Sequence, residues 1–322
     1  MNCEMKYLIL AALISAPLFV HAAPPSSVIK PAADSLVVTA KGFQTPDEAG
    51  KALLEAIVSD DSTQLIALFG NHDAELLSSG DDVEDKNNRA EFATLAQEKM
   101  RVEKIGEDKA IIYVGNMDWP FPIPLVKNAD SWHFDTQPGR QEIINRRIGR
   151  NELNTVSAMQ GYQEAQFDYA NTDRDGDGVL EYAQKLQSEP GKFDGLFWEA
   201  AEGEPQSPLG PLIAEARAEG YKIKGVTEKP APYHGYYYRI LTRQGKNVPG
   251  GKYDYVINGH MIAGFGLVAF PAQYGSSGIM TFVVNHQGKV YEKDLGPKTA
   301  EIVAKMKEYN PDATWEQFYA PE

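Results

Sequence analysis

The most distinctive chemical pattern in the sequence is the stretch DRDGDGVLE, which runs from Asp173 to Glu181. Carboxylates at loop positions one, three and five, with glycine at position six, match a calcium-binding loop, in which alternate side chains direct oxygen atoms inward. The predicted ligands are Asp173, Asp175, Asp177, the carbonyl group of Val179, and Glu181. The twelfth position is Gln184 instead of the bidentate glutamate of an EF-hand, so we expect weaker calcium binding with a structural role. The alternative is a metal-free turn whose side chains cap a following helix, 179–186.

Three histidines in the second half of the chain are candidates for catalysis or metal binding. His234, His260 and His286 follow one another at intervals of 26 residues, which fits no compact zinc motif. Ser276 lies in a glycine-flanked loop, but no nucleophile elbow surrounds it. The sequence therefore predicts no catalytic residue set. A hydrolase that uses His234, His260 or Ser276 remains the alternative, and it requires two of them within hydrogen-bond distance inside a cleft.

Two further groups of side chains have both a binding and a structural interpretation. The run YHGYYY, 233–238, places tyrosines on both faces of a strand, where they either stack on sugars or pack in the core. Four arginines precede the Asp/Gly loop at spacings that share a helical face: Arg140, Arg146, Arg147 and Arg150. They either grip an anionic component of the envelope or pair with carboxylates of this acidic chain.

These residues are expected to lie in and beside a second α+β domain, 138–322. A long central helix begins with the basic run and is amphipathic in its second half, where Leu153, Val156, Met159 and Tyr162 recur every three residues. The helix should end at Asn171. A short helix at 212–218, a series of antiparallel strands and a final helix at 297–309 follow. The expected strands are 236–242, 253–257, 265–269, 279–285 and 289–293.

A first α+β domain is expected at 41–137. Thr45, Pro46 and Glu48 mark a helix start with a capping box, and residues 60–63 should break that helix and cap a second one at 64–69. A third helix is predicted at 88–100, after an acidic loop at 80–85. A strand at 110–115 and a hairpin of 121–126 with 131–135 should complete an antiparallel sheet. The proline-rich run 119–124 is expected to be an edge strand, with a ligand-facing wall as the alternative.

The N-terminus has the features of a signal peptide, 1–22, followed by a linker, 23–40. A short polar region that ends at Lys6 precedes the apolar run 7–20, and Ala22 closes a small-residue cleavage site. We expect export to the periplasm and no transmembrane segment in the mature chain. Cys3, the single cysteine, would leave with the signal peptide, so no disulfide is expected.

The formal net charge of −14 opposes binding to nucleic acid and to anionic lipid. The hydrophobic share of 43% in 322 residues supports packed cores, and this length is typical of about two domains.

The sequence contains several distinctive phrases: WPFPIPLV at 119–126, NRRIGRNEL at 145–153, PGKFDGLFW at 190–198, SPLGPL at 207–212, PYHGYYYRIL at 232–241 and MTFVVNHQGKVYEKDLGP at 280–297. These phrases are similar to those of bacterial envelope proteins in domain-of-unknown-function family 2950. The resemblance implies export and the two-part layout, and it carries no catalytic residues. The first domain also resembles the cystatin-like cone of nuclear-transport-factor-2-like domains, and the second resembles type II pseudopilin heads. Unlike pilins, the chain has no prepilin cleavage motif, so assembly into a pilus is not implied.

Together these features predict a non-enzymatic periplasmic protein that acts by binding or assembly in the envelope and is stabilised by calcium. The expected partner is an envelope protein or a cell-wall component. The alternative is an envelope hydrolase that acts on cell-wall material.

Overall fold

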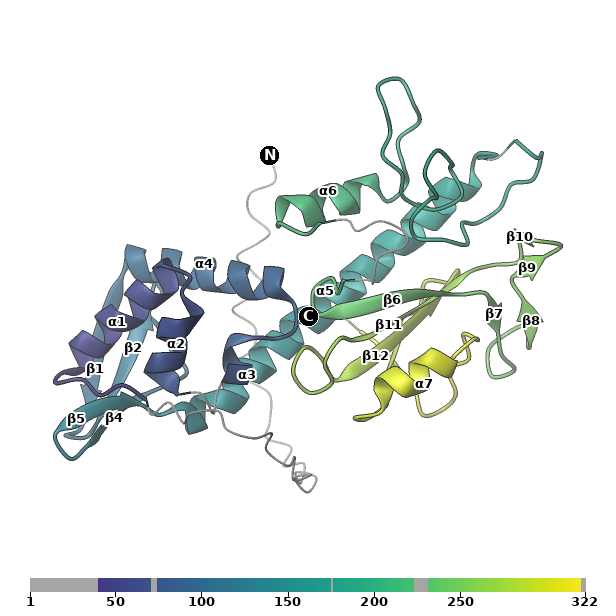
Figure 1. The fold of residues 1–322 in the computed structure, drawn as a ribbon. Helices are drawn as coiled ribbons and strands as arrows, with labels where there is room; N and C mark the ends of the chain where they lie inside the picture. The colour runs from purple at the N-terminus through teal and green to yellow at the C-terminus, as the bar shows by residue number, and fades with distance from the viewer. Residues whose placement is uncertain (1–39, 71–73, 175, 223–230, 320–322) are drawn as a thin grey trace, which may run out of the picture. The chain divides into compact units, whose positions relative to one another are not determined.

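The computed structural model describes residues 40–70, 74–174, 176–222 and 231–319 (Figure 1). Residues 37–322 form one compact unit. Every pairing between the named strands of the described ranges is antiparallel, and helices pack on both sheets. The α+β class expected from the sequence is therefore confirmed. The division into two domains, at 41–137 and 138–322, stays a prediction.

The first part of the chain begins with helices whose starts are determined by capping residues. The helices are α1 (Pro46–Val58), α2 (Ser62–Phe69), α3 (Ala74–Leu77) and α4 (Asp82–Glu98). The Thr45 side chain accepts a hydrogen bond from the Glu48 N–H, and Asp61 accepts from Thr63 and Gln64. The start of α1 agrees with the sequence prediction, whereas α2 begins two residues earlier than the predicted helix 64–69.

The third helix starts earlier than expected. Asp81 is its N-cap, and its side chain accepts from the Glu84 N–H, so the predicted acidic loop at 80–85 is largely helical. Acidic residues in a first turn are stabilised by the positive end of the helix dipole, which explains the composition. The predicted helix at 88–100 therefore has the wrong start, and its last residue, Met100, belongs to a strand that the sequence did not indicate.

The first sheet lies after α4. Its strands are β1 (Met100–Ile105), β2 (Lys109–Val114), β3 (Trp119–Pro120), β4 (Leu125–Asn128) and β5 (Ser131–Phe134), in the order β1-β2-β4-β5 with β3 beside β2. The predicted hairpin forms, with Lys127 opposite Trp132, but its first strand covers 125–128 instead of the expected 121–126. Ala110, Ile112 and Val114 alternate along β2 toward the first hydrophobic core, which the helices cover.

One helix, α5 (Thr136–Ala170), runs from the first sheet to the second part of the chain and ends at Asn171, as predicted. Near its start, Ile143 and Ile144 pack on the first core. Near its end, Val156, Met159 and Tyr162 belong to the second core. The two groups of apolar residues on α5 therefore serve different cores.

The second sheet has the strand order β14-β13-β12-β11-β6. Its strands are β6 (Tyr236–Leu241), β11 (Gly266–Pro271), β12 (Met280–Asn285), β13 (Tyr291–Asp294) and β14 (Glu316–Gln317). Two short ribbons pair β7 (Arg243–Gln244) with β8 (Tyr253–Asp254), and β9 (Val256–Ile257) with β10 (His260–Met261). The remaining helices are α6 (Gly210–Ala218) and α7 (Thr299–Lys305). Alternate residues of β11 face opposite sides, so Leu267 joins the α5 core, and Val268 joins a third cluster with Val303 of α7.

Three expectations for this part are corrected. The expected strand 253–257 is divided between β8 and β9, and the last helix is confined to 299–305. No helix forms over 179–186. Instead, Tyr182 pairs with Met261, and the buried Gln166 side chain both accepts from the Ala183 N–H and donates to the Ala183 carbonyl. Partners outside the segment thus replace the hydrogen bonds that a helix would have supplied.

The described helices include none that is long and apolar enough to cross a membrane.

Candidate functional site

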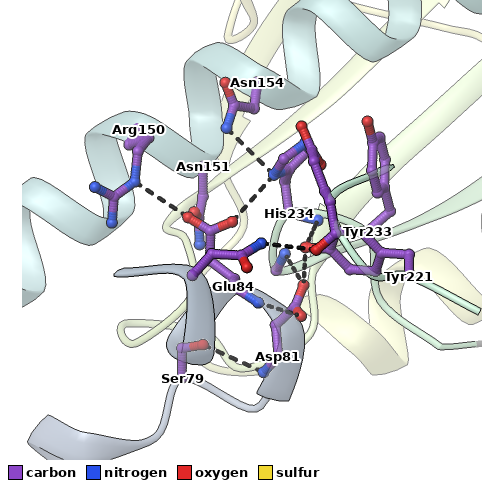
Figure 2. Close-up of polar contacts among 12 residues, drawn as sticks. Ser79, Asp81, Glu84, Arg150, Asn151, Asn154, Tyr221, Tyr233 and His234 are labelled. Atoms are coloured by element: carbon purple, nitrogen blue, oxygen red, sulfur yellow. Dashed lines mark hydrogen bonds and ion pairs between the residues drawn. The ribbon is translucent and has the colours of Figure 1, made fainter. Parts of the chain in front are cut away.

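A cluster of largely buried polar residues, which also includes the exposed Arg150, lies where the start of α4 meets the segment that leads into β6 (Figure 2). We call it the junction cluster. From the start of α4 it contains Asp81, Glu84 and Asp85; from α5 it contains Arg147, Arg150, Asn151 and Asn154; and from the last segment it contains Tyr221, Tyr233 and His234. These residues come from three separate regions of the sequence.

Asp81 is the centre of the cluster. Its side chain is 3% exposed, and one carboxylate oxygen caps α4. The other oxygen accepts hydrogen bonds from the Tyr221 hydroxyl at 2.9 Å and from the Gly235 N–H at 3.0 Å. The Tyr221 hydroxyl in turn accepts from the His234 N–H at 3.2 Å. Burial and the charge of Asp81 raise the pKa of Tyr221, so the phenol remains a donor.

His234 has a positive φ of 48°, which is uncommon for a residue with a side chain. Both of its ring nitrogens face carboxylates: Nδ1 lies 3.2 Å from Glu84 Oε2, and Nε2 lies 3.4 Å from Glu219 Oε2. Asn154 Nδ2 is a further neighbour of Nδ1, at 3.3 Å. Because both nitrogens have partners within the protein, this arrangement leaves His234 poorly placed to accept a proton from a substrate.

Gly235 continues this unusual backbone with a φ of 71°. A Cβ atom there would lie 2.5 Å from Asn151 Nδ2 and 3.0 Å from the Ser277 Cβ. Only glycine therefore allows the chain to approach α5 this closely.

Glu84 and Asp85, two of the three acidic residues in the first turn of α4, respond differently to burial. Burial tends to raise the pKa of Glu84, but hydrogen bonding to His234 and the charge of Arg150 outweigh it, and the pKa is lowered. Arg150 Nε donates to Glu84 Oε1 at 3.1 Å. Burial raises the pKa of Asp85, although its carboxylate accepts the Ser79 N–H at 2.8 Å and lies near the charge of Arg147.

Arg147 is a buried cation in the same cluster. Its guanidinium donates to the Leu76 carbonyl at 2.8 Å and to Ser276 Oγ at 3.4 Å. Burial lowers its pKa, and the charge of Asp85 opposes that shift. Arg146 pairs with Glu142 on the exposed side of α5. Arg146 and Arg150 therefore pair with carboxylates, as the pairing interpretation expected, whereas the hydrogen bonds of Arg147 go to a carbonyl group and a hydroxyl group.

The candidate catalytic residues lie in different surroundings. His260 Nδ1 faces Asp177 and Glu181, whereas Ser276 accepts from Arg147. The His286 ring packs against Tyr255 and Phe265, and burial lowers its pKa. No hydrogen bond or ion pair among the described residues joins His234, His260 and Ser276 to one another. Two surface hollows, of about 510 and 350 Å³, are lined by other residues.

The Asp/Gly loop is partly closed by its own hydrogen bonds. Asp173 accepts the Gly176 N–H at 2.8 Å with one carboxylate oxygen and the Gly178 N–H at 2.9 Å with the other. Gly178 has a φ of 87°, which agrees with the sharp turn expected there. Asp177 accepts from the backbone N–H of Val179.

The loop is also tied to the β9–β10 ribbon. Glu181 Oε2 accepts the Met261 N–H at 2.9 Å. The other Glu181 oxygen lies 3.6 Å from His260 Nδ1, and Asp177 Oδ2 lies 3.3 Å from the same atom. Two predicted ligands therefore converge. Asp175 lies outside the described residues, and within the described ranges no group of three His, Cys, Asp or Glu side chains has an arrangement that could hold a metal.

The tyrosine run 233–238 packs largely inside the protein. Tyr236 is fully buried, and its hydroxyl donates to the Met280 carbonyl at 3.0 Å. Tyr238 donates to Thr155 on α5, and the Tyr237 ring lies against Phe270. These contacts correspond to the core-packing interpretation of the run.

Sequence reasoning identified His234 and the α5 arginines but not their acidic partners. Glu84 and His234 are 150 residues apart, so no local spacing connects them. The one available signal was the density of acidic residues at 81–85, which was interpreted as a loop.

Comparison with known proteins gives one match. No curated protein and no solved structure matches the chain, so the likenesses to cystatin-like domains and to pseudopilin heads stay predictions. The model of the family described as "Protein of unknown function (DUF2950)" matches residues 40–318, which span both sheets, α5 and the junction cluster. The chain therefore belongs to the DUF2950 family.

Proposed function

We propose that the protein is exported to the periplasm and acts in the cell envelope by binding or assembly instead of catalysis. The N-terminal pattern at 1–22, which lies outside the described residues, supports export. The observation that favours binding over catalysis is the environment of His234. Both of its ring nitrogens face carboxylates of the protein itself, at 3.2 and 3.4 Å, so the most elaborate polar site joins parts of the chain.

Calcium is proposed as a structural ion of the Asp/Gly loop. Asp177 and Glu181 both face His260 Nδ1 beside the β9–β10 ribbon, at 3.3 and 3.6 Å, and an ion bound by these two carboxylates would offset the repulsion between their charges. Such an ion would hold the loop against the ribbon. Asp173 and Asp175 are included in the proposed site because of their spacing in the sequence.

The proposed partner is an envelope protein or a cell-wall component. A sedimentation experiment with purified cell-wall sacculi separates binding from hydrolysis in one tube. Mature protein is incubated with sacculi in calcium or in chelator and then centrifuged. We expect protein in the pellet and no soluble wall fragments in the supernatant.

Each other outcome has a defined meaning. Release of soluble fragments that is lost in His260→Gln or Ser276→Ala would replace the binding proposal by the hydrolase alternative. If the protein stays in the supernatant, a cell-wall ligand is excluded, and crosslinking in intact cells then tests for a protein partner. Cell fractionation combined with mass spectrometry tests export, with a mature chain that begins at Ala23 as the expected product.

A further inference from the structure

The contacts between the two cores of the protein are polar, although each core is apolar. The first core contains residues from α1 to β5, and the second contains residues from α5 to the last strands. Between them lie the hydrogen bonds of the junction cluster. A polar contact of this kind separates at lower cost than a shared apolar core, because water can replace its hydrogen bonds.

Among the described helices, α5 has residues that contact both sides. Arg147 donates to the Leu76 carbonyl of the first part at 2.8 Å and to Ser276 Oγ of the second part at 3.4 Å. Arg150 donates to Glu84 of the first part at 3.1 Å, and Asn151 donates to the Ser277 carbonyl of the second part at 3.0 Å. The contacts of α5 therefore change from one side to the other between Arg147 and Asn151.

Gly149 lies between these two residues, and close packing does not explain why this position is a glycine. It is exposed, and a Cβ atom built on it would meet no atom within 4 Å. Glycine in a helix interior costs stability relative to alanine, because it has more backbone freedom to lose. Gly139 of the same helix differs, since a Cβ there would lie 2.5 Å from the Pro122 carbonyl oxygen. Close packing therefore explains Gly139 but not Gly149.

We infer that α5 is a hinge at Gly149, about which the junction cluster opens and closes while both cores stay folded. Opening separates the contacts that cross the hinge and keeps those on either side of it. The crossing contacts are Tyr221 and Gly235 with Asp81, His234 and Arg150 with Glu84, Asn87 with the Glu219 carbonyl, and Arg147 with Ser276. This device is independent of what the protein binds, and it would vary the angle between the two cores.

Amide hydrogen exchange reads the opening directly. The junction amides are those whose acceptors lie across the hinge, such as the Gly235 N–H that donates to Asp81, whereas the amides of β11 and β12 lie in the sheet core. In the wild-type protein the junction amides should exchange faster than the sheet amides, because they open without global unfolding.

A matched pair of substitutions in one helix tests the position of the hinge. Gly149→Ala should slow exchange of the junction amides about fivefold, since alanine favours the helical over the bent state. Gly161→Ala is the control, because a Cβ there has room, with Leu212 at 3.8 Å, and residue 161 stays helical in both states. It should leave junction exchange unchanged while it stabilises the helix to a similar degree.

Asn87→Ala tests the hinge by weakening a contact that holds the junction cluster closed. It removes the exposed hydrogen bond to the Glu219 carbonyl, at 2.9 Å, and places a better helix former in α4. Junction exchange should therefore become faster even where overall stability does not fall. Equal effects of Gly149→Ala and Gly161→Ala on the junction amides, or junction amides as slow as those of β11 and β12, would overturn the hinge.

Discussion

The Tyr221 hydroxyl connects three segments of the chain. It donates to Asp81 of the α4 cap and accepts the backbone N–H of His234, and the residue is 7% exposed. A hydrogen bond to a buried carboxylate is stronger than one between neutral groups, and a donor left without a partner in such a place is costly. This single oxygen atom therefore helps to hold His234 in its positive-φ conformation.

The substitution Tyr221→Phe removes that oxygen and little else. We expect it to lower the free energy of unfolding by about 1–3 kcal/mol, because Asp81 loses a donor and the His234 N–H loses its acceptor. Tyr237→Phe is the control, since the Tyr237 ring packs on Phe270 and no described hydrogen bond uses its hydroxyl. Urea denaturation of both variants measures the difference, and similar losses would contradict the role assigned to Tyr221.

Glu84 and Asp85 are adjacent carboxylates with opposite pKa shifts. The pKa of Glu84 is lowered from 4.5, so its contribution to stability is present above that value and is lost as the pH falls through the folded-state pKa. The pKa of Asp85 is raised from 3.8, so its contribution is present below that value and is lost as the pH rises through the folded-state pKa. The two residues should thus give opposite pH dependences within one helical turn.

The test compares Glu84→Gln and Asp85→Asn with the wild type in denaturation experiments across the acid range. Relative to Glu84→Gln, the wild type should gain stability as the pH rises through the Glu84 window below 4.5. Relative to Asp85→Asn, it should lose stability as the pH rises above 3.8. If the stability difference changed with pH in the same direction in both comparisons, the opposite pKa shifts assigned to Glu84 and Asp85 would be wrong.

At this scale the sequence identified some functional groups but not their arrangement. His234 and Arg147 were recognised from their types, whereas Asp81 and Tyr221 were not, because a hydrogen bond across 140 residues leaves no periodic signal. The preference of an aspartate for a helix N-cap is a local property of the sequence. The hydrogen bonds that the other carboxylate oxygen of Asp81 accepts depend on the tertiary fold.

Among the elements, prediction succeeded where local chemistry decides the outcome. Thr45 and Asp61 begin helices through their own side chains, and the hairpin around 127–130 has its own turn. Prediction failed where residues far away in the sequence determine the local structure. The β1 residues have few apolar positions and become a strand by pairing with β2, and 179–186 is held by Gln166 and Met261. The position of the Asp/Gly loop followed from spacing alone, but its attachment to β9–β10 did not.

Calcium should raise the melting temperature of the protein through this loop. At free calcium of about a hundred times the dissociation constant, the stabilisation would be about 2.7 kcal/mol. Asp175→Ala is the informative variant and should abolish the response. Asp173→Ala is a poor test, because the Asp173 carboxylate also holds the Gly176 and Gly178 amides without any ion.

Thermal unfolding in chelator and in calcium, with calorimetry for bound metal, provides the measurement. Magnesium should substitute poorly, because it prefers a smaller octahedral shell. An unchanged melting temperature in wild type together with no bound calcium would leave the loop as a hydrogen-bonded turn.

For the molecule as a whole, the hypothesis of two separable domains depends on α5. Its first turns bring Ile143 and Ile144 to the first core, so a fragment that ends at the predicted boundary, 137, lacks part of that core. We expect fragment 40–146 to unfold cooperatively and to be more stable than 40–137, because it buries those two side chains.

The two fragments can be compared by circular dichroism during heating. Fragment 40–146 that carries Ile143→Ser and Ile144→Ser controls for chain length, and its stability should fall to that of 40–137. If neither fragment shows a cooperative transition, the first part does not fold alone, and the two-domain prediction fails.

The two hydrogen bonds between Gln166 and Ala183 have a consequence for protein engineering. They connect Gln166, before the Asp/Gly loop, to Ala183, after it, and so close the loop into a ring at α5. The hydrogen bond between Glu181 and Met261 is a second attachment of the same loop. The closure entropy of such a ring grows only slowly with its length. A few Gly/Ser residues inserted beside Gly176 would therefore disrupt the ligand spacing while the net charge and both attachments stay the same. The ring is thus also a suitable place to insert a reporter tag that would prevent calcium binding by the loop without unfolding the protein.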